Sequence, residues 1–271
     1  MNYAAAIGDD NPAYFDDEDR EGIIAPPMFS AAATWPVIEN LAQYLATDDF
    51  PHEILLTQVH YTEHLMFHRP IRPDEELTIQ GVIAAIVPHR AGTHVVIRFE
   101  ARDQDKNLVF TEHNGGMMRG VHCRDTGEGV ENLPKVPAYN DGNRLWWESK
   151  IPIDPMLPFI YDGCTNIVFP IHTSRKFARQ VGLPGVILQG TATLALAVRE
   201  LVHREAGGDP CRLKEIYCRF TGMVLPGSMI KLQVYGTQSG YNAGDIFFDV
   251  FNQEDEKVIS KGYALIGSGL A

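Results

Sequence analysis

The stretch His60-Tyr61-Thr62-Glu63-His64 carries two histidines and a carboxylate at a spacing that zinc enzymes use. In those enzymes the pattern H-x-x-E-H lies on a helix, so that both histidines meet one metal ion. Here residues 58–67 are rich in β-forming types, and on a strand residues four apart are separated by about 13 Å. The sequence therefore favours a strand without a metal site.

The cysteines offer little chemistry of their own. They show neither a C-x-x-C spacing nor the density of a secreted disulfide scaffold, which predicts reduced, mostly structural thiols. They are Cys123, Cys164, Cys211 and Cys218. A nucleophilic role for Cys164, two residues beyond Asp162, is conceivable, but a buried apolar role is favoured.

Charge and composition exclude several classes of protein. The 23 Lys and Arg residues against 35 Asp and Glu give a formal charge of −12, which repels nucleic acid. The sequence contains neither a nucleotide-binding glycine pattern nor a run of about 18 apolar residues that would span a membrane. With Asp9 and Asp10 near the N-terminus, where a signal peptide would be apolar, we expect a cytoplasmic protein without a membrane partner.

The length of 271 residues suits one large domain or two small ones, and internal repeats decide for two. Tyr3 and Pro12 recur 158 positions later, at Tyr161 and Pro170. Further matches occur at shorter offsets, as loop deletions would produce. They are Pro73 with Pro226, Leu77 with Ile230, and Asp103-Gln104 with Asn252-Gln253.

Each half contains a helical pattern followed by β-rich sequence. In the first half the apolar residues Ile38, Leu41, Ala42 and Leu45 have helical spacing. In the second half residues 190–205 predict a helix that is apolar on nearly every side at its start, which indicates burial against a sheet. The predicted strands are 53–67, 76–87, 94–103, 108–119, 211–223, 229–238, 245–252 and 258–266.

These patterns predict an α+β architecture in which a helix packs on a curled antiparallel sheet, made twice. We place the domains at residues 1–126 and 148–271. The Gly- and Pro-containing stretch 127–147 is predicted to be a crossing linker. Trp146 and Trp147 close it, and we expect them to pack the linker onto the second half rather than to line a ligand pocket.

The second half contains a run of residues with a recognisable order. They are Tyr161, Pro170, His172, Phe177-Ala178, and the stretch Gly182-Leu183-Pro184-Gly185-Val186-Ile187-Leu188-Gln189-Gly190. This order resembles the signature of the MaoC-like (R)-specific enoyl-CoA hydratases, which reads approximately Y-x5-D-x-N-P-x-H, then F-A, then G-x-P-x-x-I-x-H-G. The first half resembles the degenerate N-terminal domain of two-domain members, through Asp9-x-Asn11-Pro12 and the phrase Phe67-His68-Arg69-Pro70-Ile71-Arg72-Pro73-Asp74.

The resemblance implies a double hotdog, in which two hotdog domains share one continuous sheet. It also implies reversible addition of water to a trans-2-enoyl thioester, with an Asp and a His acting on the water. His172 is then the general acid/base. The backbone at Gln189 and Gly190, where the buried helix begins, is implied to stabilise the developing oxyanion.

The sequence departs from the signature at the site itself. The family Asp corresponds to Ile167, the Asn to Phe169, and the His before the last Gly to Gln189. In the first half Asp9 and Asn11 are present, but the His position is Tyr14, and Asp9-Asp10-Asn11-Pro12 is also a good turn sequence. Three replacements are open in the second half: Asn166 orients the water, Asp162 reaches in, or His172 acts alone.

For substrate binding the resemblance indicates Tyr161, Phe169 and the basic residues Arg175 and Lys176, whose side chains suit the phosphates of coenzyme A. An exposed helix face explains the two basic residues equally well. No cofactor is expected beyond the coenzyme A of an acyl-CoA substrate, and a homodimer is expected. Two alternatives remain: a catalytically silent acyl-CoA binding protein or subunit, and a hotdog thioesterase.

Overall fold

The computed structural model describes residues 1–45, 54–55, 58–139, 144–235 and 244–268. The strands are β1 (Gln58–Phe67), β2 (Thr78–His89), β3 (Gly92–Arg102), β4 (Leu108–Arg119), β5 (Leu145–Pro152), β6 (Leu213–Phe220), β7 (Met229–Tyr235), β8 (Asp245–Phe251) and β9 (Lys257–Ile266). They form one sheet in the order β2-β3-β4-β1-β6-β9-β8-β7-β5, with antiparallel neighbours throughout.

All eight strands predicted from the sequence are present, with ends that differ by a few residues. Positions 53, 56–57 and 236–238 of those predictions lie outside the described residues. The sequence analysis missed β5, whose first three residues fall inside the predicted linker. This strand pairs with β7 and forms the outer edge of the second half of the sheet.

The second half is built around helix α6 (Gly190–Glu205), which begins and ends where the sequence predicted. Residues 191–198 are all buried, because the helix packs against the sheet below and against other elements on its remaining sides. Two shorter helices precede it: α4 (Leu157–Thr165) and α5 (Arg175–Gln180).

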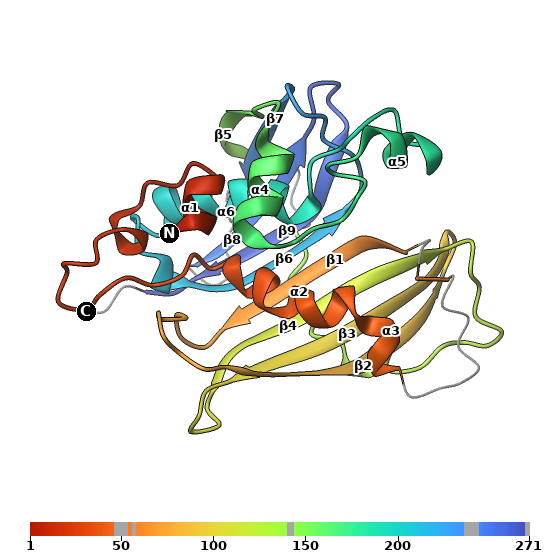
Figure 1. The fold of residues 1–271 in the computed structure, drawn as a ribbon, viewed down its shortest axis with the longest axis horizontal. Coiled ribbons are helices and arrows are strands. Elements are labelled where there is room, and N and C mark those ends of the chain that lie inside the picture. The colour runs from red at the N-terminus through yellow and green to blue at the C-terminus, as the bar shows by residue number, and fades with distance from the viewer. Residues whose placement is uncertain (46–53, 56–57, 140–143, 236–243, 269–271) are drawn as a thin grey trace.

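The first half carries a shorter helical layer. Helix α1 (Asn2–Ala6) and the 3-10 turn η1 (Pro12–Tyr14) come first, followed by α2 (Phe29–Glu39) and α3 (Leu41–Tyr44), which lie against the first-half strands (Figure 1). The predicted continuous helix is interrupted at Asn40, whose side chain donates to the carbonyl oxygen of Pro36 at 2.9 Å. This side-chain bond competes with the helical backbone bond and ends α2.

The two halves join along β1 and β6, which pair antiparallel from Thr62 opposite Arg219 to Met66 opposite Glu215. The helices also meet across this seam, since α1 packs against α4 (Figure 1). Tyr3 on α1 and Tyr161 on α4 hydrogen-bond through their hydroxyls at 2.8 Å. The shared ladder makes one sheet of two hotdog units.

The connecting segment runs back over the sheet. Glu128 forms an isolated bridge with Ile86 of β2, and the 3-10 turn η3 (Val130–Asn132) follows. Trp147 is half-buried against the main core and donates to Glu205 of α6 at 2.5 Å, as expected of a packing residue. Trp146 is 55% exposed, so the same expectation is wrong for it. Among the described residues, no helix is both long and apolar enough to cross a bilayer.

Candidate active site

His172 lies in the loop between α4 and α5, close to the segment that leads into α6. Its Nδ1 is 2.8 Å from the carbonyl oxygen of Ile187. A carbonyl oxygen only accepts, so Nδ1 carries the proton and Nε2 keeps its lone pair. Burial lowers the pKa of His172 to about 4, partly offset by this hydrogen bond. The side chain is therefore a neutral imidazole of fixed tautomer, which is the form that a general base requires.

Asp162 is buried on α4, where it accepts a hydrogen bond from the side-chain amide of Gln189. The same amide donates to the carbonyl oxygen of Pro158 at 2.9 Å. Burial raises the pKa of Asp162 to about 6, and the bond from Gln189 opposes that rise. Gln189, the residue that precedes α6, is thus bound to α4 through its side chain.

The residues around the missing family carboxylate point in different directions. Ile167 is only 5% exposed and belongs to the main apolar core. Asn166 is exposed and caps α4 in the left-handed conformation, with φ of 58°. Phe169 is half-buried and packs edge to face on Phe177, with ring centroids 6.4 Å apart. The structure therefore brings Asp162 to Gln189 and leaves Asn166 facing outward.

Gly190 is the first residue of α6, where the backbone N–H groups have no partner within the helix. A Cβ at this position would lie 3.2 Å from the ring of Phe220, at the end of β6. Glycine thus allows that ring to pack directly under the start of the helix. Tyr161 is fully buried behind this region, and burial raises its pKa to about 12.

The basic residues Arg175 and Lys176 are exposed in the first turn of α5. The helix is capped by Ser174, whose hydroxyl accepts from the N–H of Phe177 at 3.2 Å. The side chains of Arg175 and Lys176 are therefore accessible to solvent, three and four residues after His172.

The first-half residues of the signature build a turn. Asp9 accepts from the N–H of Asn11 at 3.2 Å, and Asn11 accepts from the N–H of Ala13 at 3.0 Å. Asp9 also lies 3.0 Å from His203, near the C-terminal end of α6. Since His172 lies by the other end of this helix, about 20 Å away at 1.5 Å per residue, Asp9 does not serve it. Tyr14 is buried as well.

A buried acidic cluster in the first half was not found from the sequence. Glu63 on β1 and Glu112 on β4 are both fully buried, and Asn114 donates to both, at 3.3 and 3.2 Å. Burial and the proximity of the two carboxyls raise the pKa of Glu112 well above its usual value, and burial raises that of Glu63. A sequence signal was present, because Glu63 is in phase with Leu65 and Glu112 with Phe110, both core residues.

The structure confirms that His60, Glu63 and His64 lie on a strand. The ladder between β1 and β4 slips between His60 and Thr62, so one extra residue enters β1 there. This bulge places His60 and Glu63 on the same face, with His60 Nε2 3.0 Å from Glu63 Oε2. His64 lies on the other face and pairs with Glu215 at 2.6 Å. The two histidines of the H-x-x-E-H pattern therefore do not converge.

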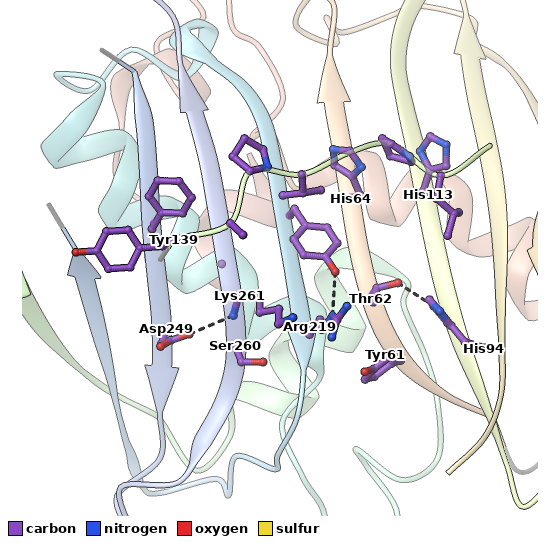
Figure 2. Close-up of a pocket in the computed structure, with 18 of the residues that line it drawn as sticks. Tyr61, Thr62, His64, His94, His113, Tyr139, Arg219, Asp249, Ser260 and Lys261 are labelled. Atoms are coloured by element: carbon purple, nitrogen blue, oxygen red, sulfur yellow. Dashed lines mark hydrogen bonds between the residues drawn. The ribbon is translucent and has the colours of Figure 1, made fainter. Parts of the chain in front are cut away.

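The face of the sheet that carries His64 has a large cleft of about 780 Å³, beside residues 130–139 of the connecting segment (Figure 2). Its polar side chains mostly bind one another: Thr62 lies 3.1 Å from His94, and Arg219 donates to Tyr217 at 3.1 Å. Figure 2 shows Tyr61, Thr62, His64 and His113 on this side. The cleft is lined by neither His172 nor any residue of α6.

Both halves of the chain match families of dehydratase domains. Residues 147–248 match the MaoC-like domain, and residues 1–112 match the dehydratase domain region of FAS1-like proteins. The chain joins a FAS1-like dehydratase region to a MaoC-like domain. The MaoC-like domain carries His172 and α6, whereas the FAS1-like region carries the cluster of Glu63 and Glu112.

The matches to known proteins extend over most of the chain. It is 23% identical over 254 residues to the peroxisomal multifunctional enzyme type 2 of Drosophila melanogaster, covering 90% of this chain. The chain spans 41% of that enzyme and 4–8% of several fungal fatty acid synthase beta subunits that it also matches.

Solved structures agree on the fold. A MaoC-like dehydratase from Phytophthora capsici superposes with a TM-score of 0.83 at 20% identity, over 99% of this chain and 92% of that one. A Mycobacterium tuberculosis protein described as a double hotdog superposes with a TM-score of 0.61 at 12% identity, over 98% of this chain and 90% of that one. The predicted α+β double hotdog is confirmed.

Proposed function

We propose that this chain is an acyl-thioester hydratase/dehydratase that adds water to, or removes it from, a trans-2-enoyl-CoA. The observation that carries the proposal is the state of His172, a neutral imidazole whose Nδ1–H is bound to Ile187 and whose Nε2 is free to accept a proton. It lies in the MaoC-like domain, at the end of α6 where Gly190 offers its N–H. Both matched families are dehydratase domains.

In the hydration direction, Nε2 of His172 takes one proton from a water molecule while the water oxygen bonds to the β-carbon. The electrons of the double bond move through the α-carbon to the thioester oxygen. The start of α6 stabilises that oxyanion through backbone N–H groups and the helix dipole. The proton on His172 then returns to the α-carbon, so that one water has been added. Dehydration runs the same steps in reverse.

The neighbouring residues support this role. We assign Asp162 to holding Gln189, and through it the backbone that leads into Gly190. We assign the exposed Asn166 to the mouth of the site. Phe169 is assigned to the acyl-CoA contact, with Arg175 and Lys176 meeting the phosphates of coenzyme A. Tyr161 is fully buried, so we assign it to supporting the substrate site from within the core and not to direct contact with the substrate.

The remaining assignments follow the sequence. The reaction needs no cofactor other than the coenzyme A that is part of the substrate. We retain domains at residues 1–126 and 148–271, a homodimeric state and a cytoplasmic location as parts of the proposal.

One observation favours a second candidate, a silent acyl-CoA binding protein. Ile167 fills the family carboxylate position with a side chain packed in the core. A site of this kind would bind the thioester without turning it over.

The two candidates separate in a turnover assay. A panel of short, branched and bulky trans-2-enoyl-CoAs is followed at the enoyl absorbance, with free thiol measured in parallel. The proposal expects loss of the enoyl signal without thiol release, abolished in His172→Ala and retained in His122→Ala, a change at an exposed histidine. Tight binding without turnover across the panel would favour the silent binder, and thiol release would indicate a thioesterase.

A further inference from the structure

His60 lies under the start of α6, although it belongs to the other half of the chain. Its ring packs against that of Phe220, with centroids 4.6 Å apart. The ring of Phe220 in turn lies 3.2 Å from the position of a Cβ on Gly190. One aromatic ring therefore separates the first-half histidine from the first residue of the buried helix.

His172 approaches the same helix end from the second half. Its Nδ1 bonds to Ile187, three residues before Gly190. The following residue, Leu188, donates its N–H to Val224 at 2.8 Å, just beyond β6 and Phe220. Each half of the chain thus brings one histidine into the region where α6 begins.

The hydrogen bonds of His60 set its tautomer. Nε2 lies 3.2 Å from the carbonyl oxygen of Thr62, 3.0 Å from Oε2 of Glu63 and 3.2 Å from the side-chain amide nitrogen of Asn114. The carbonyl oxygen only accepts, and the amide hydrogens of Asn114 have the carboxyl oxygens of Glu63 and Glu112 to donate to, so Nε2 carries the proton and Nδ1 keeps the lone pair. Within the described residues Nδ1 meets no hydrogen-bonding group, and a quarter of the side chain is accessible.

Glu63, which contacts His60, belongs to a pair of buried carboxyls. Glu63 and Glu112 are both fully buried, and the side-chain amide of Asn114, which also lies 3.2 Å from Nε2 of His60, donates to both carboxyls. The two carboxyls also contact each other, which requires a shared proton, because two buried carboxylates would repel. This layer holds the acceptor for the Nε2–H of His60 in place. Burial lowers the pKa of His60 to about 4, which keeps the ring neutral.

We propose that His60 is a second catalytic residue of the site, which holds the attacking water through Nδ1 and so replaces the carboxylate lost at Ile167. The inference rests on the proposed function. Glu63 is a positioning residue in this scheme, because it acts on the water only through His60.

The water then has two acceptors. One hydrogen points to Nδ1 of His60 and stays on the water oxygen, which becomes the hydroxyl of the product. The other passes to Nε2 of His172 as the oxygen bonds to the β-carbon, and from there to the α-carbon. His60 gains no net proton, so a neutral imidazole serves throughout.

The test compares His60→Ala and His60→Gln with a control four residues along the same strand, His64→Gln, whose side chain lies on the opposite face. Each variant is assayed for kcat and KM on the best enoyl-CoA of the panel, and for its thermal unfolding temperature. We expect His60→Ala to lower kcat by about 100-fold or more with little change in KM. His60→Gln, whose amide oxygen still accepts from water, should recover about tenfold of that loss. The control should retain the wild-type kcat.

Failure of this inference can be told apart from failure of the proposed function. If the wild type turns over substrate and His172→Ala is inactive, but the His60 variants keep their kcat, the inference is wrong and the proposed function stands. If the wild type turns over no member of the panel, the proposed function fails and the inference falls with it. If both His60 variants also unfolded below the assay temperature, the fall in kcat would reflect loss of the folded protein. That result would also overturn the inference, because it would indicate a structural role.

Glu63 gives an independent readout. Glu63→Gln keeps an oxygen that accepts from Nε2–H of His60, whereas Glu63→Leu does not. Glu63→Gln should therefore stay within about fivefold of the wild-type kcat, and Glu63→Leu should approach His60→Ala. Equal kcat values for the two Glu63 variants would overturn the assigned role.

Discussion

The hydroxyl oxygens of Tyr3 and Tyr161 lie 2.8 Å apart, and these two tyrosines occupy matching positions in the two halves of the chain. Their rings meet edge to face, with centroids 5.7 Å apart. Equivalent side chains touch each other only beside the axis that relates the halves. The pair therefore marks the pseudo-twofold axis of the double hotdog, on the helical side of the seam between β1 and β6.

Loss of either hydroxyl should destabilise the protein. Tyr3→Phe and Tyr161→Phe each leave a buried hydroxyl without this partner, which we expect to cost about 1–2 kcal/mol in the free energy of unfolding. The double variant should lose less than the sum, because both groups are then gone. Urea unfolding of the three variants measures this, with Tyr44→Phe at an exposed position as the control. Additive losses would show that the two hydroxyls do not interact.

Four histidines that are wholly or partly buried should each contribute stability that is lost in acid. The pKa values of His60, His94, His113 and His172 are all lowered to about 4, mainly by burial. Between about pH 6.5 and pH 4 the unfolded chain binds protons that the folded chain does not, so stability present above pH 6.5 is lost as the pH falls.

Urea midpoints of the wild type and of a histidine variant, compared across this range, isolate this contribution from that of the buried carboxyls, which has the opposite sign. Replacing one of these histidines, as in His94→Gln, should reduce the slope by up to about 1.4 kcal/mol per pH unit. His122→Gln, at an exposed histidine, should leave the slope unchanged. A His94→Gln profile that runs parallel to the wild-type profile from pH 6.5 to pH 4 would contradict the prediction.

The acidic pair acts in the opposite direction. Burial and the neighbouring Glu63 raise the pKa of Glu112 above its ordinary 4.5, so the folded state holds a proton that the unfolded state releases as the pH rises. Stability is thus lost above about pH 4.5. Glu112→Gln, which cannot ionise, should gain stability relative to the wild type by about 1 kcal/mol or more between pH 5 and pH 8. Glu128→Gln is the exposed control, and a difference that does not grow with pH would refute this reading.

Restoring the family carboxylate should not restore the family site. Ile167→Asp places an acid in the main core and should cost about 3 kcal/mol of stability. Ile167→Leu keeps the apolar volume and should cost less than about 1.5 kcal/mol. Thermal and urea unfolding give both values. If Ile167→Asp unfolded like the wild type and turned over substrate faster, position 167 would be open to the site.

Prediction from the sequence succeeded where the pattern was local. Helix α6 was placed at its true ends because its apolar residues recur at helical spacing and its start is apolar all round. Strand β5 was missed because its residues alternate weakly and mostly face outward at a sheet edge, so that little apolar periodicity remains. The helix predicted around residues 38–45 is interrupted between α2 and α3 by a side-chain hydrogen bond from Asn40, which the spacing of apolar residues does not reveal.

For the candidate site, the resemblance indicated His172 and Gly190 but not the residues around them. Glu63 and Glu112 are 49 positions apart, and only the register between β1 and β4 brings them together. The placement of His60 beside Glu63 depends on the slip in that ladder, which strict alternation along a strand would not predict. The pairing of Asp162 with Gln189 depends on the packing of α4 against α6.

The ladder between β1 and β6 also bears on how the two halves diverged. In a twofold homodimer every substitution occurs at both sites at once, so a harmful change on one side is never offset by an independent change on the other. A fused pair escapes that constraint, since each half mutates alone while the common ladder keeps their registration. The second half has Ile167 at the carboxylate position of the signature, and the first half carries His60, Glu63 and Glu112 on the strands beside the seam. The two halves therefore differ in the polar groups they carry, while one backbone ladder fixes how they sit together.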